Sequence, residues 1–546
     1  MPTTTIPLIG QQTRRGFGID VSTTKDQYFA AALAIKTVNQ AEGSASYYLQ
    51  KRPGINDDGN LGSGAGTAIF KSPSTGYTLF AFGGGNSTII VAGVYTAGTI
   101  TGLCHSIIET IINGVTHYLF SSSDGTGWYL VSTAGSQTAY TADGNNSTTI
   151  TDIKISGVNN TAGLYPGQLL TAATNIVAGS RIVSVDAAAF TAVLDTATTG
   201  GAFNDLAITK TPIAKIQSAN FPSMVGSFAE MDGYVFAVNS KGEIFNSDIN
   251  TVTTWQASSK IVANLKTDTA VTLLRHKNHI VCFGESSTEF FINFGNAFGS
   301  ILAARKELFT NIGMFSTAAT KKFTQIFDHV FWIGNDLCLY TFQELSPVNL
   351  NKEGMTLGTI SAAPERISSF TIGADIIVHI NSSTSARDKW YSVINNEFFD
   401  PVMGVAGMIW SQNLPAETTT VASGVSSSVT DGNVYALRSN VYQDDGSAFT
   451  MTIQTQPYSL NNGKGFTVNR VRLLADKQSS GASALETSSD DYASWVTRGS
   501  FDLTRDNKEI HRCGYHRSSC AFRITDSGNQ AWRGQAIVVD WEPCSA

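Results

Sequence analysis

This chain of 546 residues contains few charged side chains. Asp, Glu, Lys and Arg make up 14% of it, about half the fraction usual in soluble domains. The 43 acidic and 36 basic residues give a net charge of −7. That surplus of acid argues against tight binding to a phosphate backbone, which requires clustered Lys and Arg. It does not argue against a passage through which DNA slides, and sparse charge suits a subunit whose surface is hidden in an assembly.

Cysteine is also scarce. The six cysteines include no C-x-x-C pair, which favours a reducing compartment over a disulfide framework. Cys282 and Cys338 lie within apolar runs and are predicted to be buried thiols. No run of eighteen apolar residues occurs, so no membrane insertion is expected. The N-terminus lacks a charged start followed by an apolar stretch, so no secretory signal is expected.

Glycine, serine and threonine are abundant instead. The 50 glycines suit turns with positive φ, and hydroxyl side chains suit the exposed faces of strands. We therefore predict an all-β protein. Its length exceeds that of one ordinary hydrophobic core, which indicates two to four domains.

Short strand–turn–strand units recur from about residue 67, at intervals of roughly 30–45 residues. Their turns carry Asp124-Gly125, Asp232-Gly233 or Lys241-Gly242, the residue types that favour tight hairpins. One such unit cannot bury both of its faces, whereas radial stacking of several units around an axis can. The pattern predicts a β-propeller body of six or seven blades, formed by residues 67–147 and 209–455.

Three further segments flank or interrupt this body. Residues 1–66 form an N-terminal arm, and residues 456–546 form a C-terminal β domain resembling a sandwich. Residues 148–208 are nearly free of Lys and Arg and resemble a small β module common in phage tail and surface proteins. We interpret this segment as an insertion in a blade loop, because surface loops tolerate added length. It would contact fibres or neighbouring subunits, or decorate the surface without a partner.

Two regions resemble one known family. Ile280–Gly284 reads IVCFG and precedes a turn and strand with Ser286, Ser287, Thr288, Phe290 and Phe291. Near the C-terminus, Arg512–Arg517, Phe522–Ile524 and Val538–Glu542 follow a similar order of elements. These residues resemble the packaged-DNA stabilisation proteins of short-tailed bacteriophages, which form the tail hub or nozzle.

The resemblance implies a structural component of the virion tail, assembled in the host cytoplasm, and no enzyme. Its subunits would form a homo-oligomeric ring, most often a hexamer, below the portal and adaptor proteins. The ring would continue the channel for genomic double-stranded DNA, retain the packaged genome and dock tail fibres or spikes. The family also begins with a long arm, so Lys25–Gln40 is expected to be extended, although the segment also reads as a short helix. Tyr47–Ile55 is typical of that arm, although Pro53-Gly54 alone would make a type II turn.

Basic residues carry the functional prediction. The candidates for a ring interface or a DNA-facing belt are Lys51, Arg52, Arg512, Arg517, Arg523 and Arg533. Such clusters stand out in a chain with few charges. The alternative is a solvated sandwich face with internal ion pairs.

No motif predicts catalysis, a cofactor or a metal. The glycine runs lack the Gly-Lys-Ser/Thr that ends a phosphate-binding loop. Sugar cleavage would need two carboxylates placed as a pair, and the sequence spacing pairs none of the acidic candidates, which are Glu285, Glu289, Asp328 and Asp336. His276 and His279, read as one strand, would point to opposite faces, which disfavours a shared metal with Cys282. A second group has members that lie closer together in the sequence, and for it a metal site stays open as an alternative: His511, Cys513, His516 and Cys520.

Two other classes of protein fit parts of the sequence. A carbohydrate-binding or depolymerising tail protein would present an aromatic platform with paired carboxylates. A bacterial adhesion propeller would carry a secretory signal.

Overall fold

The computed structural model describes residues 2–8, 28–39, 44–135, 139–296, 298–315, 323–351, 366–372, 375–381, 388–402, 408–410, 419–422, 433–438 and 440–544. Within these residues nearly every regular element is a β-strand. The helical segments among them are two short 3-10 turns, η2 (Ser132–Ala134) and η3 (Lys306–Leu308). The predicted all-β fold class is confirmed, and no described helix is long and apolar enough to cross a membrane.

Seven antiparallel units of four strands form the body in the described part of the chain. Six are separate sheets, and in the other one β10–β12 are completed by the end of β19. Blade 1 contains β6 (Gly66–Lys71), β7 (Thr78–Phe82), β8 (Ser87–Val91) and β9 (Tyr95–Ile100), and blade 2 contains β10 (Cys104–Ile112), β11 (Val115–Ser122), β12 (Gly127–Val131) and β19 (Ala202–Lys215). Blade 3 contains β20 (Met224–Met231), β21 (Tyr234–Asn239), β22 (Glu243–Ser247) and β23 (Trp255–Val262). Blade 4 contains β24 (Ala270–His276), β25 (His279–Gly284), β26 (Thr288–Asn293) and β27 (Leu302–Ala304).

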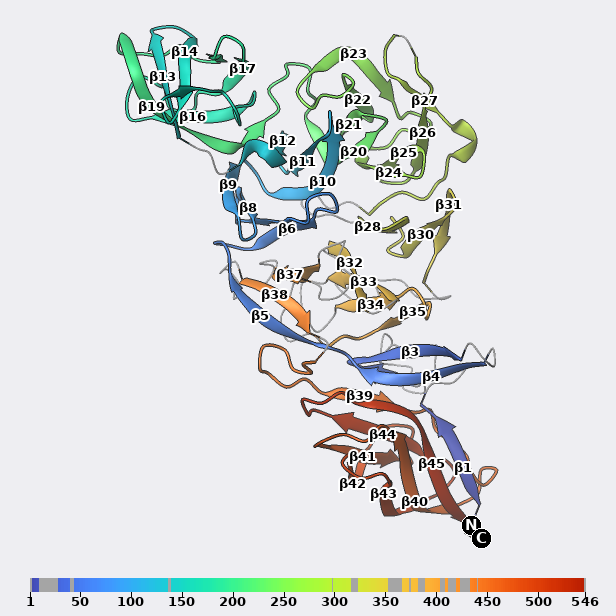
Figure 1. Cartoon of the computed structure of the whole chain (residues 1–546). Helices are drawn as coiled ribbons and strands as arrows, with labels where there is room; N and C mark the ends of the chain where they lie inside the picture. Colours follow the sequence, from blue (N-terminus) through green and yellow to red (C-terminus); the bar gives the residue numbers. More distant parts are fainter. Residues whose placement is uncertain are drawn as a thin grey trace.

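The remaining three units complete the circle. Blade 5 contains β28 (Phe323–Ile326), β29 (His329–Ile333), β30 (Leu339–Gln343) and β31 (Ser346–Asn349). Blade 6 contains β32 (Arg366–Ile372), β33 (Asp375–Asn381), β34 (Lys389–Ser392) and β35 (Glu397–Phe399). Blade 7 contains β36 (Met408–Trp410), β37 (Thr419–Ala422), β38 (Asn433–Arg438) and β5 (Gly54–Asn60). Figure 1 shows these blades arranged around a centre.

The first strand of each blade lies innermost. Contacts run from β6 to β10, β20 and β24, then from β28 to β32, β36 and back to β6. A shared hydrophobic core joins blades 4 and 5. The ring is closed by β5, which comes from before blade 1 and pairs with β38 of blade 7 from Asn433–Asn60 to Arg438–Gly54. The two ends of the propeller are thereby held in one sheet.

The turn signals in the sequence explain the blade hairpins. Asp232 and Gly233 join β20 to β21 with φ values of 55° and 79°, both in the left-handed region that Asp and Gly tolerate. The predicted hairpin is confirmed there. β25 and β26 are the strands predicted around IVCFG, and Phe283 packs with its ring centroid 5.2 Å from that of Trp332 in the next blade. Cys282 and Cys338 are buried, as predicted.

The inserted module lies beside blade 2. Its strands are β13 (Ala139–Asn145), β14 (Thr149–Ile155), β15 (Val158–Asn159), β16 (Gln168–Ala172), β17 (Ile182–Asp186), β18 (Thr191–Leu194) and the first part of β19. The expected start at residue 148 falls between β13 and β14, which pair with each other. β19 pairs with β13 in the module and with β12 in the blade, so one strand joins both bodies.

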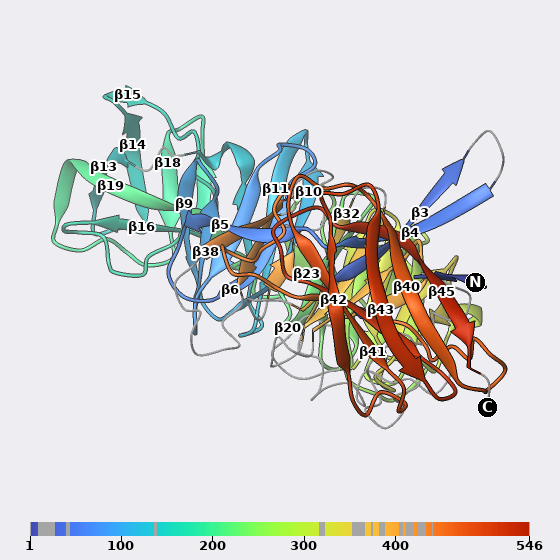
Figure 2. The ribbon, with the colours of Figure 1, turned by 90° about the horizontal axis from the view of Figure 1, so that it is seen from below.

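Two further sheets form the C-terminal domain. One contains β1 (Thr3–Pro7), β3 (Ala32–Asn39), β4 (Ser44–Lys51), β40 (Phe466–Ala475), β43 (Lys508–His516) and β45 (Arg533–Pro543). The other contains β2 (Tyr28–Ala30), β39 (Met451–Gln454), β41 (Ala482–Ser488), β42 (Val496–Asp502) and β44 (Ala521–Asp526). In Figure 2 their strands lie in front of the body, and the β3–β4 hairpin extends away from it.

The predicted N-terminal arm is therefore distributed over two bodies. β1 to β4 complete the C-terminal sheets, β5 completes the propeller, and the part of Lys25–Gln40 that the structure describes is extended. Pro53-Gly54 makes no hairpin, because β4 and β5 belong to different sheets. Glycine is required at this crossing, since a Cβ on Gly54 would lie 2.1 Å from the carbonyl oxygen of Gln443.

Candidate functional site

Arg52 lies at the crossing between the propeller and the C-terminal domain, and its side chain is fully buried. The guanidinium forms a bidentate pair with Asp444, with Nη1 donating to Oδ1 at 2.9 Å. It also donates to the carbonyl oxygens of Pro401 and, at 2.8 Å, Val402. Its centre lies 3.8 Å from the centroid of the Phe449 ring. Planar, bidentate recognition of this kind is specific to arginine.

Lys51 is the neighbouring buried cation. Its Nζ lies 3.1 Å from Oδ1 of Asp526 and donates to the carbonyl oxygen of Gly528 at 2.6 Å. The other oxygen of Asp526 accepts from Ser483 and Gln530, at 2.9 and 3.0 Å. Burial lowers the pKa of Lys51, and the Asp526 carboxylate opposes that shift.

These residues form one cluster, which we call the junction cluster: Lys51, Arg52, Asp444, Phe449 and Asp526. It joins the end of β4, the segment after blade 7 and the end of β44. A ring interface or DNA-facing belt requires exposed cations, and the structure gives Lys51 and Arg52 internal partners instead. The sequence could not show this, because Asp444 and Asp526 lie hundreds of positions away.

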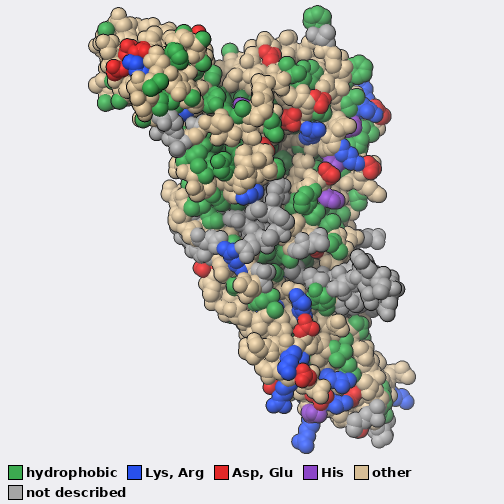
Figure 3. Space-filling model, viewed as in Figure 1, with side chains coloured by type: hydrophobic (Ala, Val, Ile, Leu, Met, Phe, Trp, Pro, Cys, Tyr) green, Lys and Arg blue, Asp and Glu red, His purple; other side chains and the backbone are tan. Residues whose placement is uncertain are grey.

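Arg512 and Arg517 differ from this pair in being exposed. Among the residues that the structure describes, neither forms an ion pair. Arg533 is also exposed, and its Nε donates to Oε1 of Gln50 at 3.1 Å, beside the ring of Tyr48. Lys and Arg side chains gather over this domain at the bottom of Figure 3. These three arginines are available to a partner.

Arg523 is half-buried and already paired. Its Nε donates to Oε2 of Glu486 at 2.6 Å, across the β41–β44 pairing. The guanidinium lies 4.2 Å from the ring centroid of Trp495. This residue fits the alternative of a sandwich face with internal ion pairs.

Sequence reasoning missed two arginines of β40. Arg470 pairs with Asp540 at 2.5 Å and with Glu509 at 3.4 Å. Arg472 lines a groove of about 580 Å³ with Arg533 and Tyr48, and its Nε has no hydrogen-bond partner in the described residues. Alternation along FTVNRVRLLA was the available signal, since it places both arginines on the face opposite the buried Val471 and Leu473.

The histidines and cysteines do not form a common metal site in the described residues. His276 and His279 are direct cross-strand partners at the β24–β25 turn, so reading them as one strand was wrong. His276 instead bonds the carbonyl oxygen of Glu344 at 2.8 Å. In the C-terminal group, His516 is buried, with Nε2 3.6 Å from Sγ of Cys520, whereas His511 is exposed and faces Glu509.

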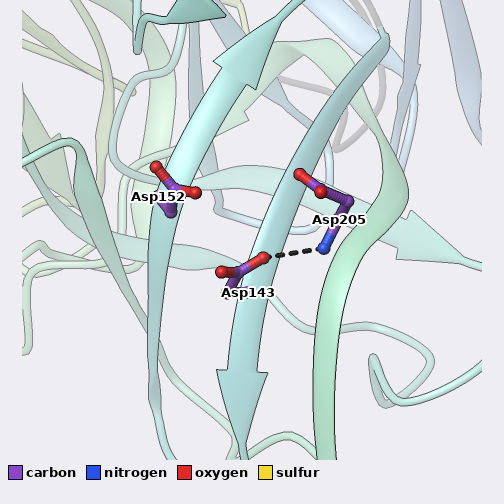
Figure 4. Close-up of side chains that lie close together, drawn as sticks. All are labelled: Asp143, Asp152 and Asp205. Atoms are coloured by element: carbon purple, nitrogen blue, oxygen red, sulfur yellow. Dashed lines mark hydrogen bonds between the residues drawn. The ribbon is translucent and has the colours of Figure 1, made fainter. Parts of the chain in front are cut away.

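Three aspartates of the inserted module do come together, as Figure 4 shows: Asp143, Asp152 and Asp205. The amide of Asp205 donates to Oδ1 of Asp143 at 2.7 Å. Lys154 lies 2.6 Å from Asp152 and 2.9 Å from Asp205, and these pairs raise its pKa. The ammonium group of Lys154 thus already pairs with two of the three carboxylates, and exposed acidic clusters of this kind are common without a metal.

Comparison with known proteins yields one family. Residues 171–338 match the model described as "Bacteriophage P22 Gp10, beta-propeller". The match covers less than half of the chain and runs from the inserted module into blade 5. No curated protein matches the chain.

Two solved structures are similar in part. Raptor from Chaetomium thermophilum is 10% identical at a TM-score of 0.35, and the match covers 71% of this chain but only 28% of Raptor. The computationally designed Ika8 protein is 12% identical at a TM-score of 0.33, with 70% of this chain and 99% of Ika8 covered. At TM-scores this low, neither likeness says anything about function.

The family match and the fold agree on a coarse assignment. They support a phage structural protein, built around a β-propeller and forming a component of the virion. They also suggest a protein that is not an enzyme.

Proposed function

We propose that this protein forms a ring of six copies in a phage tail and serves as its hub or nozzle. The observation that carries the proposal is the match of residues 171–338 to the P22 Gp10 propeller family. The ring lies below the portal and adaptor proteins, continues the channel for genomic DNA and helps to retain the packaged genome. Tail fibres or spikes dock on its outside.

The chemistry of the surface supports a mechanical role. The net charge of −7 would disfavour persistent binding of DNA along a lumen, because like charges repel and no counterions are released. Exposed Arg512, Arg517 and Arg533 lie on one domain, where they offer attractive contacts to phosphate or to an acidic partner. DNA could then be held where this domain faces it.

The closed propeller suits a part that transmits mechanical force. The first and last blades are tied by β5 and β38, and the buried junction cluster fixes the propeller to the C-terminal domain. A force that pulls the propeller away from the C-terminal domain would therefore act on paired strands and buried ion pairs rather than on a loose linker.

Light scattering of the purified protein tests the proposal, alone and with a portal–adaptor complex. A discrete oligomer that forms alone or only on the complex is expected. A monomer that ignores the complex would overturn the ring. If that monomer bound host polysaccharide, the carbohydrate-binding alternative would take its place.

A further inference from the structure

A groove of about 580 Å³ lies on the C-terminal domain, where β4, β40 and β45 adjoin in one sheet. Its walls include Tyr48 of β4, Arg472 of β40 and Arg533 of β45. The segment just before β43 adds Asp506 and Asn507. We call this hollow the arginine groove, because two guanidinium groups line it.

The strand β45 is irregular at the arginine groove. Leu474 of β40 pairs with Ala536, and Ala475 pairs with Gly534, so Gln535 is left over as a bulge. A bulge bends its strand and interrupts the ladder of hydrogen bonds, and such irregularities are frequent beside functional sites. The groove therefore lies at a defined break in the sheet and not between loops alone.

Arg472 forms no ion pair within the part of the chain that the structure describes. The carboxylates beside it in the sheet are Glu509 and Asp540, and both pair with Arg470 instead. Its Nε is buried and has no hydrogen-bond partner among the described residues. A buried donor without an acceptor is unfavourable, so an oxygen atom of a ligand would relieve that cost.

Arg533 is the second guanidinium of the arginine groove, and its contacts are with neutral groups. Its Nε donates to Oε1 of Gln50 at 3.1 Å, and its centre lies 5.5 Å from the ring centroid of Tyr48. The aromatic ring attracts the cation without neutralising it. Since no carboxylate pairs with Arg533 in the described residues, its charge is also left for a ligand.

The two aspartates that line the groove each have a lysine nearby. Asp506 pairs with Lys477 at 3.3 Å. Burial lowers the pKa of Lys508, and the charges of Asp506 and Asp476 oppose that shift. These carboxylates are therefore compensated on their own side of the groove, and the two arginines remain without an anionic partner.

The size of the groove favours a peptide side chain over DNA. A volume of about 580 Å³ admits a few side chains. A DNA duplex is too wide to enter, since its major groove alone is about 12 Å across. Its phosphates supply one charge per about 1.7 Å of axis, so a duplex lying over the groove would also bring phosphates close to Asp476 and Asp506. A single carboxylate on a flexible side chain avoids both problems.

We propose that the arginine groove binds a carboxylate side chain from an acidic peptide segment of a partner protein. The carboxylate oxygens accept charge-assisted hydrogen bonds from Arg472 and Arg533, which suit planar guanidinium groups. Tyr48 and Leu474, which is 39% exposed, pack against the aliphatic part of the entering side chain. The site does not depend on the number of copies in a ring, and it specifies the chemistry of a partner.

Fluorescence anisotropy with a labelled oligoglutamate peptide and the full-length protein tests this site. We expect the peptide to bind, and the binding to weaken as salt is added. A labelled oligoglutamine peptide should not bind. Arg472→Gln and Arg533→Gln should each weaken oligoglutamate binding about tenfold, because each removes a hydrogen bond to a charged group.

Arg512→Gln is the matched control, since Arg512 is an exposed arginine of the same domain that does not line the groove. Its affinity should equal that of wild type. Arg533 is exposed as well, so Arg533→Gln reports on the groove even if Arg472→Gln fails to fold. Equal weakening in Arg512→Gln and Arg533→Gln would assign the binding to general positive charge and overturn the site. Absence of oligoglutamate binding to wild type would overturn it too.

The charge of the groove can also be changed at Asn507, which is exposed and lines it. Asn507→Asp keeps the size of the side chain and should weaken oligoglutamate binding, whereas Asn507→Lys should strengthen it. The same variants are then titrated with a labelled short DNA duplex. A duplex whose affinity follows these substitutions as closely as that of the peptide would make the groove a nucleic-acid site and overturn the proposal. Peptide affinity that is indifferent to the charge at Asn507 would contradict it as well.

Discussion

The junction cluster and the exposed arginines of the C-terminal domain hold similar cations in opposite environments. Arg52 is fully enclosed and has a carboxylate, three carbonyl groups and an aromatic ring around it. Arg512 and Arg517 face solvent. A buried ion that loses its partner is strongly unfavourable, whereas an exposed one is hydrated. The first region therefore sets how the domains are joined, and the second can meet another molecule without a change in the fold.

The largest expected effect comes from breaking the buried pair. Arg52→Ala should lower the free energy of unfolding by about 3–5 kcal/mol, because it leaves Asp444 buried without its cation. Urea unfolding would measure the decrease. Limited proteolysis should show separation of the propeller from the C-terminal domain.

Arg512→Ala is the control for this variant and should stay within about 0.5 kcal/mol of wild type. Equal stability of both variants would mean that the Arg52 pair does not hold the junction.

A buried histidine makes the C-terminal domain sensitive to acid. Burial, with a contribution from Arg498, lowers the pKa of His516 from its ordinary value of 6.5 to about 4. The imidazole ring contacts Phe466, and Ser489 and Cys520 face its nitrogens. The unfolded chain takes up a proton below pH 6.5 and the folded chain does not, so stability falls as the pH drops from 6.5 to 4. The decrease by pH 4 is about 3 kcal/mol at most.

His516→Gln should flatten this dependence in urea unfolding at several pH values. Ser489→Ala removes a neighbour but keeps the histidine, so the slope should persist. An unchanged slope in His516→Gln would assign the acid sensitivity to other groups.

Local sequence predicted the fold class and several hairpins but not the closure of the propeller. Turn geometry depends on adjacent residues, as at Asp232-Gly233, so it can be read from a short segment. The pairing of Gly54–Asn60 with Asn433–Arg438 spans most of the chain, and no local pattern encodes it. For the same reason the arm appeared as a separate element.

For the candidate site, the sequence predicted that basic residues would be involved but not which of them are exposed. The spacing of basic residues marked Arg512, Arg517 and Arg533, which are exposed. The same reasoning included Lys51 and Arg52, whose burial depends on distant partners. The exposure of Phe294 and Phe298 was not predicted, because local sequence patterns do not encode an exposed phenylalanine.

Arg523 has an exposure to solvent intermediate between that of the junction cluster and that of the exposed arginines. Its pair with Glu486 is half-buried and its guanidinium covers Trp495. Arg523→Met keeps part of the packing against the ring and removes the charge, so a decrease of about 1 kcal/mol is expected in urea unfolding. A decrease as large as that of Arg52→Ala would place this pair with the junction cluster.

The smallest effect on stability is expected for Arg512→Ala combined with Arg517→Ala, because both side chains are exposed. If these arginines meet phosphates in the assembled ring, the variant should retain DNA less well. The dependence of DNA affinity on salt should then become shallower by about one unit of logarithmic slope for each phosphate that is no longer neutralised. Binding of a short duplex to rings at several salt concentrations measures this. The matched control is Arg505→Ala, since Arg505 is exposed but paired with Asp502. Equal salt slopes in wild type and the double variant would show that these arginines do not contact DNA, and their exposure would then point to an acidic protein partner.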